Sequence, residues 1–181
     1  MLLDEDFEAF EASAWIAADE GVWAISTDTE LQSQVYGQSE TGASSPHLVS
    51  SGDVSWTNVR VEADFKIVAF NGSSSSYLAG LCVRVRDAEN FYMVGLRSDN
   101  GRMQVRNFED GGSNLEQSES EVGTVGQWYH MRVDAIGSTL TVYVDEVLVL
   151  TINDSTHANG GIGLCTTRAS AVFDNVLVTA P

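Results

Sequence analysis

The sequence predicts an all-β protein, an antiparallel sandwich or jelly roll in which two sheets close over one core. Segment after segment alternates apolar and polar residues, which is the period of a strand with one buried face. Glycine (16 residues), serine, threonine and asparagine are plentiful and suit tight turns. A helical period shows only in the short stretch 4–15. About ten or more short strands therefore fit the length of 181 residues.

The clearest alternation lies at 58–70. Charged residues take one face of this segment and apolar residues take the other, as in a half-buried antiparallel strand. The residues predicted to face the core are Val59, Val61, Ala63, Phe65 and Ile67.

The stretch 78–108 predicts three strands, at 78–86, 91–97 and 102–108. They are joined by turns at "DAEN" and "SDNG", and an Asn-Gly pair between alternating runs is a strong hairpin signal. The residues predicted to face the core are Leu81, Val83, Val85, Tyr92, Val94, Leu96, Met103 and Val105.

Four further strands complete the prediction. Segments 128–136 and 138–150 alternate on either side of Gly137 and should form a hairpin. Segments 160–168 and 171–179 supply the last two strands. The inward residues of the hairpin are Met131, Val133, Ala135, Leu140, Val142 and Val144. No linker, charge block or repeat divides the chain, so residues 1–181 are predicted to form a single domain.

The chain is strongly acidic, with 26 acidic and 9 basic residues and a formal net charge of -17. The resulting field repels nucleic acid and anionic membrane surfaces, so we expect neither as a partner. No apolar run is long enough to cross a bilayer, and no signal-peptide pattern follows Met1.

The motifs "SWTNVRVEADFKI", "AGLCVRVRDAENFYMVGLR", "GQWYHMRVDAIGSTLTVYVDEVLVL" and "GGIGLCTTRASAVFDNVLV" follow one another along the chain. In this order they resemble concanavalin A-like, laminin-G-like jelly rolls of the carbohydrate-binding type, which are attached to secreted bacterial polysaccharide lyases and glycosidases. The resemblance implies two facing sheets, one of them concave, with glycan bound on the concave face or its rim. It also implies a secreted location and a catalytic domain in the parent protein.

Some members of that group hold a structural calcium near the paired termini, and the resemblance implies candidate ligands here. Calcium takes six to eight oxygen ligands, and one ion shared by the first and last strands would fix the termini. The candidate ligands are Asp6, Glu8, Asp174 and Asn175. The alternative is that these residues are solvated acids or turn caps.

The stretch 79–108 holds five of the eight arginines of the chain. By alternation, the outward faces of its strands carry four of these arginines and no carboxylate. Neighbouring strands lie ~5 Å apart and alternate residues ~7 Å apart, which is near the charge spacing of a polyuronate. A guanidinium pairs bidentately with carboxylate or sulfate. The predicted ligand-binding residues are Arg84, Arg86, Arg97, Gln104, Arg106, Tyr77, Phe91 and Arg168.

The alternative for these arginines is pairing with acids on nearby loops, namely Asp87, Glu89, Asp99, Glu109 or Asp110. Among the aromatic residues, four tryptophans lie at strand entries and are predicted to be structural: Trp15, Trp23, Trp56 and Trp128. The aromatic residues predicted to be available for sugar contact are Tyr77, Phe91, Phe108 and Tyr143.

A catalytic role is less well supported by the sequence than a binding role. The E-x-D-x-E motif of glycosidases with this fold is absent, and the histidines and cysteines have no zinc-site spacing. We therefore expect a non-catalytic module that binds an acidic polysaccharide. One alternative is a small lyase acting on a uronate polymer with Arg84, Arg97, Gln104 and Tyr77. The other is a laminin-G-like adhesion module.

Cys82 and Cys165 each lie in a "GLC" tripeptide, and alternation points both away from the core. If their strands are neighbours, a cross-strand disulfide joins them, as in proteins outside the cytoplasm. Two free thiols are the alternative, because the sequence does not give the Cα separation.

Overall fold

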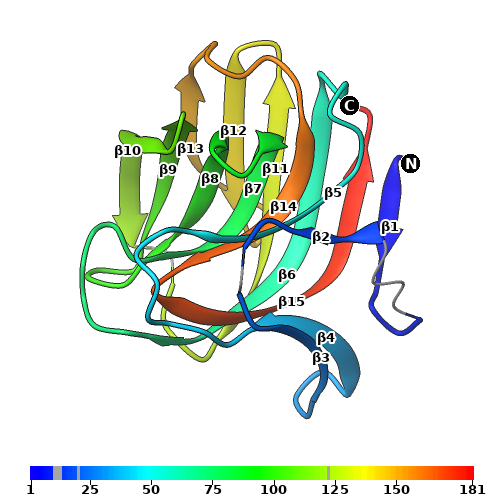
Figure 1. Cartoon of the computed structure of the whole chain (residues 1–181), viewed down its shortest axis with the longest axis vertical. Coiled ribbons are helices and arrows are strands. Elements are labelled where there is room, and N and C mark those ends of the chain that lie inside the picture. The colour runs from blue at the N-terminus through cyan, green and yellow to red at the C-terminus, as the bar shows by residue number, and fades with distance from the viewer. Residues whose placement is uncertain (10–13, 20, 122) are drawn as a thin grey trace.

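The structure is a computed structural model that describes residues 1–9, 14–19, 21–121 and 123–181, and the side chains of all of these except 116–121. In these described residues fifteen strands form two antiparallel sheets packed face to face, which confirms the predicted jelly-roll sandwich (Figure 1). The helical stretch expected at 4–15 falls partly outside the described residues. Its described part holds a short strand and no α-helix, and no helix in the described chain could span a membrane.

One sheet has eight strands, seven of them in a continuous order. That order is β13 (Val147–Asn153), β12 (Thr139–Val144), β11 (Trp128–Ile136), β6 (Val59–Phe70), β15 (Ala169–Thr179), β4 (Ser33–Gln38) and β3 (Trp23–Asp28). The eighth strand, β1 (Leu3–Glu5), also pairs with β15, so the two ends of the chain lie side by side (Figure 1).

The second sheet has seven strands. Their order is β10 (Gly112–Glu121), β9 (Arg102–Glu109), β8 (Asn90–Arg97), β7 (Leu78–Asp87), β14 (Gly161–Thr167), β5 (His47–Ser51) and β2 (Ile16–Ala17). The hairpins predicted within 78–108 are therefore β7–β8 and β8–β9, and the one around Gly137 is β11–β12.

The core between the sheets follows the predicted alternation closely. The residues predicted to face inward are at most 2% exposed in β6 and at most 4% exposed in β11 and β12. Tyr92, Val94, Met103 and Val105 join the same core from the second sheet. Each strand buries one face because every second side chain points to the opposite sheet.

The alternation of β7 breaks at Arg84. This residue has a positive φ of 53°, and the register of β7 shifts there against both of its neighbours. The bulge reverses the phase of the following residue, so Val85 joins the outer face, whereas Leu81 and Val83 face the core as predicted. The inward position predicted for Val85 is therefore wrong.

The outer face of the seven-stranded sheet carries a second apolar cluster. Its members are Leu48, Leu78, Cys82, Val85, Phe91, Met93, Phe108 and Cys165. At its centre Cys82 and Cys165 form a disulfide between β7 and β14 with a Cα–Cα distance of 6.1 Å. The free-thiol alternative is therefore wrong. Residues of the segment between β4 and β5, among them Pro46, lie beside Leu48 and Phe108 and help to cover the cluster.

Candidate functional site

The outward position predicted for Arg84 is wrong. Its side chain is 1% exposed and lies inside the end of the sandwich, because the bulge of β7 turns it away from the outer face. The guanidinium donates hydrogen bonds to the carbonyl oxygens of His157 (2.6 Å), Thr57 (3.3 Å) and Gly137. Burial lowers the pKa of Arg84. This arginine therefore joins three loops and is not available to a ligand.

Arg97 and Arg86 lie at the ends of their strands. The Arg97 guanidinium holds both carboxylate oxygens of Asp99, at 3.0 and 2.7 Å, so the alternative of pairing with a loop acid is confirmed for this residue. Arg86 is exposed beside Asp87. The side chain of Asn90 chiefly lowers the pKa of Asp87, and the charge of Arg86 contributes to the shift.

Arg106 and Arg168 lie together at a pocket of about 140 Å³ on the outer face, which we call the arginine pocket. Its lining residues are Ser44, Pro46, Ser76, Tyr77, Arg106, Phe108, Ser113, Thr167 and Arg168. Arg106 donates to the Ser113 hydroxyl (3.2 Å) and the Ser75 carbonyl (3.4 Å). Burial, aided by the charge of Arg97, lowers the pKa of Arg106.

Neither arginine of this pocket is paired with a carboxylate among the described side chains. The Nε atom of Arg106 is buried without a hydrogen-bond partner. The guanidinium of Arg168 lies 5.5 Å from the centroid of the Tyr77 ring, a cation–π contact that fixes the tyrosine at the pocket wall. The pocket thus combines two cations, several hydroxyls and an aromatic ring.

The remaining predicted contact residues differ in their access to solvent. Gln104 faces outward as predicted but is 0% exposed. The loop between β6 and β7 lies against it, and the Gln104 Nε2 atom donates to the carbonyl oxygen of Ser75 in that loop. Phe91 is also 0% exposed and stacks on Phe108, with 4.6 Å between ring centroids. The expectation that Phe91 is available for sugar contact is therefore wrong, whereas Phe108 reaches the pocket wall.

The tryptophans are structural, as predicted. Trp15 lies in the main core, and Trp23 and Trp56 pack against it. Trp128 lies under the ammonium group of Lys66, at 4.8 Å from the ring centroid.

The residues predicted to bind calcium, Asp6, Glu8, Asp174 and Asn175, surround the junction of β1 and β15. Burial raises the pKa of Asp174, and the nearby carboxylates of Asp64 and Glu8 add to this shift. The Asp174 carboxylate accepts a hydrogen bond from Ser33 (2.8 Å), and Asn175 donates its amide to Asp64 (2.8 Å). In the described residues no group of three or more His, Cys, Asp or Glu side chains is arranged to hold a metal ion. Calcium binding stays a prediction.

A buried histidine fixes the segment that borders the arginine pocket. The Nε2 atom of His47 lies 2.6 Å from Glu40, and its Nδ1 atom lies 3.1 Å from Asp19. Burial alone would lower the pKa of His47, but the two carboxylates outweigh it and raise the pKa above 6.5. The His47 hydrogen bond, with the backbone N–H groups of Gly42 and Ala43, lowers the pKa of Glu40 to about 2.

These shifts predict a stability term that depends on pH. Because the pKa of His47 is raised on folding, its contribution to the free energy of unfolding is fully present below the pKa of the unfolded chain, about 6.5. This contribution is lost as the pH rises through the pKa of the folded state. We expect His47→Gln to reduce the difference in melting temperature between about pH 6 and about pH 9. His130, whose pKa is also raised, stays in both proteins and accounts for the remaining dependence. An unchanged difference in thermal melts would contradict this assignment.

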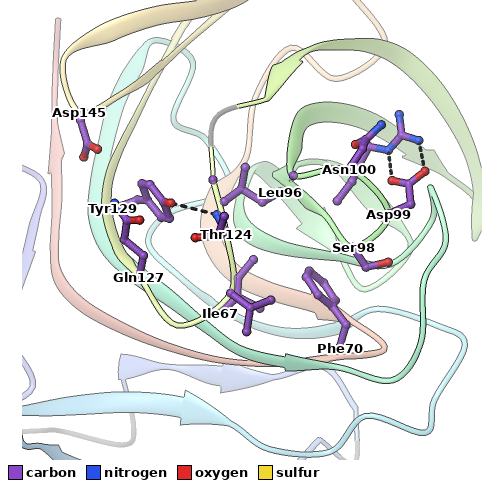
Figure 2. Close-up of a pocket in the computed structure, with 14 residues that line it drawn as sticks. Ile67, Phe70, Leu96, Ser98, Asp99, Asn100, Thr124, Gln127, Tyr129 and Asp145 are labelled. Carbon is purple, nitrogen blue, oxygen red and sulfur yellow. Dashed lines mark hydrogen bonds and ion pairs between the residues drawn. The ribbon is translucent and has the colours of Figure 1, made fainter.

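A larger cavity of about 730 Å³ opens at one end of the sandwich, which we call the end cavity (Figure 2). It lies between β6 and β11 of one sheet and β8 of the other, beside the loops 98–101 and 123–127. No sequence pattern had marked it, because its lining comes from four separate segments, at 67–70, 96–101, 123–129 and 145. Two of the loops meet at glycines: the N–H of Gly123 in "EVGTVG" donates to the carbonyl oxygen of Gly101 in "SDNG". These glycines are a local sequence feature that agrees with the close backbone contact.

Comparison with known proteins identifies the family of this chain. A family model described as the 3-keto-alpha-glucoside-1,2-lyase-like domain matches residues 4–179. The chain belongs to this family. The chain is 29% identical over 115 residues to a levanase of Bacillus subtilis. The matched region covers 64% of this chain but only 17% of the levanase.

Solved structures resemble this chain over nearly its whole length. The carbohydrate-binding module CBM66 from Bacillus subtilis has a TM-score of 0.76 and 24% identity, over 92% of this chain and 96% of that one. The cellulose-induced protein Cip1 has a TM-score of 0.75 and 11% identity, over 99% and 97% of the two chains. At these identities the likeness shows the fold, and it confirms the jelly-roll resemblance found in the sequence.

Proposed function

We propose that this chain is a non-catalytic carbohydrate-binding module that holds an anionic polysaccharide at the arginine pocket. The observation that carries the proposal is the state of Arg106 and Arg168. In a chain with 26 acidic residues, both lie in one pocket without a carboxylate partner among the described side chains. By contrast, Arg60, Lys66 and Arg132 each hold a carboxylate.

The lining of the pocket suits one acidic sugar unit. A guanidinium fork binds a carboxylate or sulfate with charge-assisted hydrogen bonds, and burial strengthens such bonds. The hydroxyls of Ser76, Ser113 and Thr167 can pair with sugar hydroxyls, and Tyr77 offers an aromatic face. At about 140 Å³ the pocket is smaller than the ~300 Å³ typical of drug-sized ligands, so it fits one unit of a longer chain.

The lyase alternative has the family description in its favour, but the arginine pocket offers little for catalysis. Arg84, one of the four residues predicted for a lyase, is buried elsewhere. Among the described pocket residues Tyr77 is the one side chain suited to proton transfer, and none of these described residues is a histidine or a carboxylate. Binding therefore accounts for the pocket better than lysis.

We infer further that the module works outside the cytoplasm beside a catalytic domain in a longer protein. A levanase and a carbohydrate-binding module among the relatives agree with a sugar ligand, and the chain matches only 17% of that levanase. The disulfide agrees with an oxidising compartment. Such a module would raise the effective concentration of the catalytic domain on its substrate.

The test is calorimetric titration with oligogalacturonate, oligoalginate and a neutral glucan at low and high salt. We expect salt-sensitive heat with at least one uronate, and loss of about 100-fold in affinity, or about 2.7 kcal/mol, in the double variant Arg106→Ala/Arg168→Ala. Arg86→Ala, an exposed arginine outside the pocket, is the matched control and should bind as before. Equal affinity of the double variant would rule out this pocket. New ultraviolet absorbance from unsaturated sugar ends would favour the lyase.

A further inference from the structure

We propose that the end cavity is a second sugar site, one that takes a neutral sugar unit. Its volume of about 730 Å³ lies within the range of about 300–1,000 Å³ found for ligand pockets, and it is several times larger than the arginine pocket. The proposal does not depend on the anionic ligand inferred above, because the two sites have different lining residues and opposite charge.

The floor of the end cavity is apolar. Figure 2 shows Ile67 and Leu96 in the middle of the cavity and Phe70 beside them. Phe70 is only partly buried and packs against the main core, so part of its ring faces the open space. The C–H face of a sugar ring gains dispersion and hydrophobic energy on such a surface.

Polar groups stand on both sides of this floor (Figure 2). Ser98, Asp99 and Asn100 lie on one side, and Gln127 and Asp145 lie on the other. Amide and carboxylate groups placed around an apolar floor can pair with the hydroxyls of a sugar whose ring rests on that floor.

The charges of the lining disfavour an anion. The described lining holds one cation, Arg97, which is already paired with Asp99. Asp145 adds a further negative charge, so a uronate or sulfate would meet net repulsion. The same groups accept hydrogen bonds from neutral hydroxyls, and the chemistry therefore points to a neutral sugar.

The walls of the cavity are fixed before any ligand enters. The N–H of Thr124 donates to the Tyr129 hydroxyl at 2.9 Å, and the N–H of Gly126 donates to the Ile67 carbonyl at 2.8 Å (Figure 2 shows the first). The bidentate ion pair holds the Asp99 carboxylate in place. A preformed site loses less entropy when it binds, which favours measurable affinity for a small ligand.

The end cavity and the arginine pocket are neighbours. The Ser98 hydroxyl, in the cavity lining, donates to the Ser74 carbonyl (3.0 Å) and accepts from the Ser74 N–H (2.8 Å). Two residues later along the same loop, Ser76 lines the arginine pocket. Segment 74–76 therefore contacts a lining residue of the end cavity at one end and lines the arginine pocket at the other.

The test is a titration of ¹⁵N-labelled protein with maltotriose, cellotriose, mannotriose and the fructan trisaccharide kestose, followed by amide chemical shifts. We expect at least one of these neutral sugars to shift Leu96, Gly101 and Thr124 more than Ser113 and Thr167 of the arginine pocket. If none of the four shifts the cavity signals, the proposal is wrong.

Variants separate this site from the arginine pocket. Val125 is 50% exposed and lines the cavity, so Val125→Trp should fill the space without unfolding the protein, and should weaken neutral-sugar binding at least about tenfold. Asn100→Ala/Gln127→Ala should also weaken it, whereas Asn153→Ala, an exposed amide on β13, is the matched control. Arg106→Ala/Arg168→Ala should leave neutral-sugar binding unchanged. Unaltered binding in Val125→Trp would overturn the assignment.

Discussion

Replacing Arg84 by methionine is expected to lower the free energy of unfolding by about 3 kcal/mol. The guanidinium serves three backbone carbonyls, of His157, Thr57 and Gly137, and the side chain is 1% exposed. Methionine keeps much of the apolar stem but leaves these carbonyls without their donor, and each buried unpaired polar group costs about 1–3 kcal/mol. Relief from burying the charge offsets part of this loss. Denaturant unfolding measures the difference.

Two further variants sharpen this test. Arg86→Met changes an exposed arginine two residues along β7 and should shift stability by no more than about 0.5 kcal/mol. Arg84→Gly accepts the positive φ without strain but still lacks the guanidinium, so it should also be destabilised. A glycine variant as stable as the unsubstituted protein would show that the hydrogen bonds contribute no more than the relief of backbone strain at this φ.

Removing the disulfide with Cys82→Ala/Cys165→Ala is expected to cost about 4 kcal/mol. The bond joins residues 83 positions apart and so closes a long loop, which restricts the unfolded chain strongly. Both sulfurs also lie at the centre of the outer apolar cluster, where the shorter alanine side chains leave a cavity. Unfolding in guanidinium under oxidising conditions measures the loss.

The reductant is the control for the disulfide. Unfolding of the unsubstituted protein in dithiothreitol should approach that of the double variant, and the double variant should not respond to dithiothreitol. Equal unfolding free energies for the oxidised protein and the double variant would contradict the expected role of the bond.

The strands were predictable because each strand that buries one face carries its own pattern. Val59, Val61 and Ala63 needed no knowledge of the rest of the chain to be placed in the core. The Asn-Gly turn likewise identified the β8–β9 hairpin from neighbouring residues. In both cases the physical signal lies within a few residues of the element it determines.

The candidate site was only partly predictable, and Arg84 shows why. The prediction from alternation assumes that successive residues point to opposite faces of the sheet. A bulge inserts an extra residue and so shifts the face of those that follow. Gly160 marks the place: a Cβ atom there would lie 2.2 Å from the carbonyl carbon of Arg84, so the two backbones meet closely. That contact comes from residues 76 positions apart and leaves no pattern near Arg84.

Alternation also gave the face of Phe91 and Gln104 correctly but not their accessibility. Both point outward from the sheet, and both are buried by neighbouring side chains and covering segments. Whether the outward face of a sheet is exposed to solvent depends on where the long loops pack against it, and strand periodicity carries no information about that.

The antiparallel sandwich, most of its core residues and the gathering of cations in 79–108 could be derived from the sequence alone. These properties follow from side-chain period and composition, which act locally. The position of each arginine depended on tertiary packing: Arg84 turns inward, Arg97 holds Asp99, and Arg106 of β9 lies in one pocket with Arg168, which lies between β14 and β15. The same packing brings four segments together around the end cavity. Such sites form where separate segments converge, and that convergence is set by the packing of the two sheets.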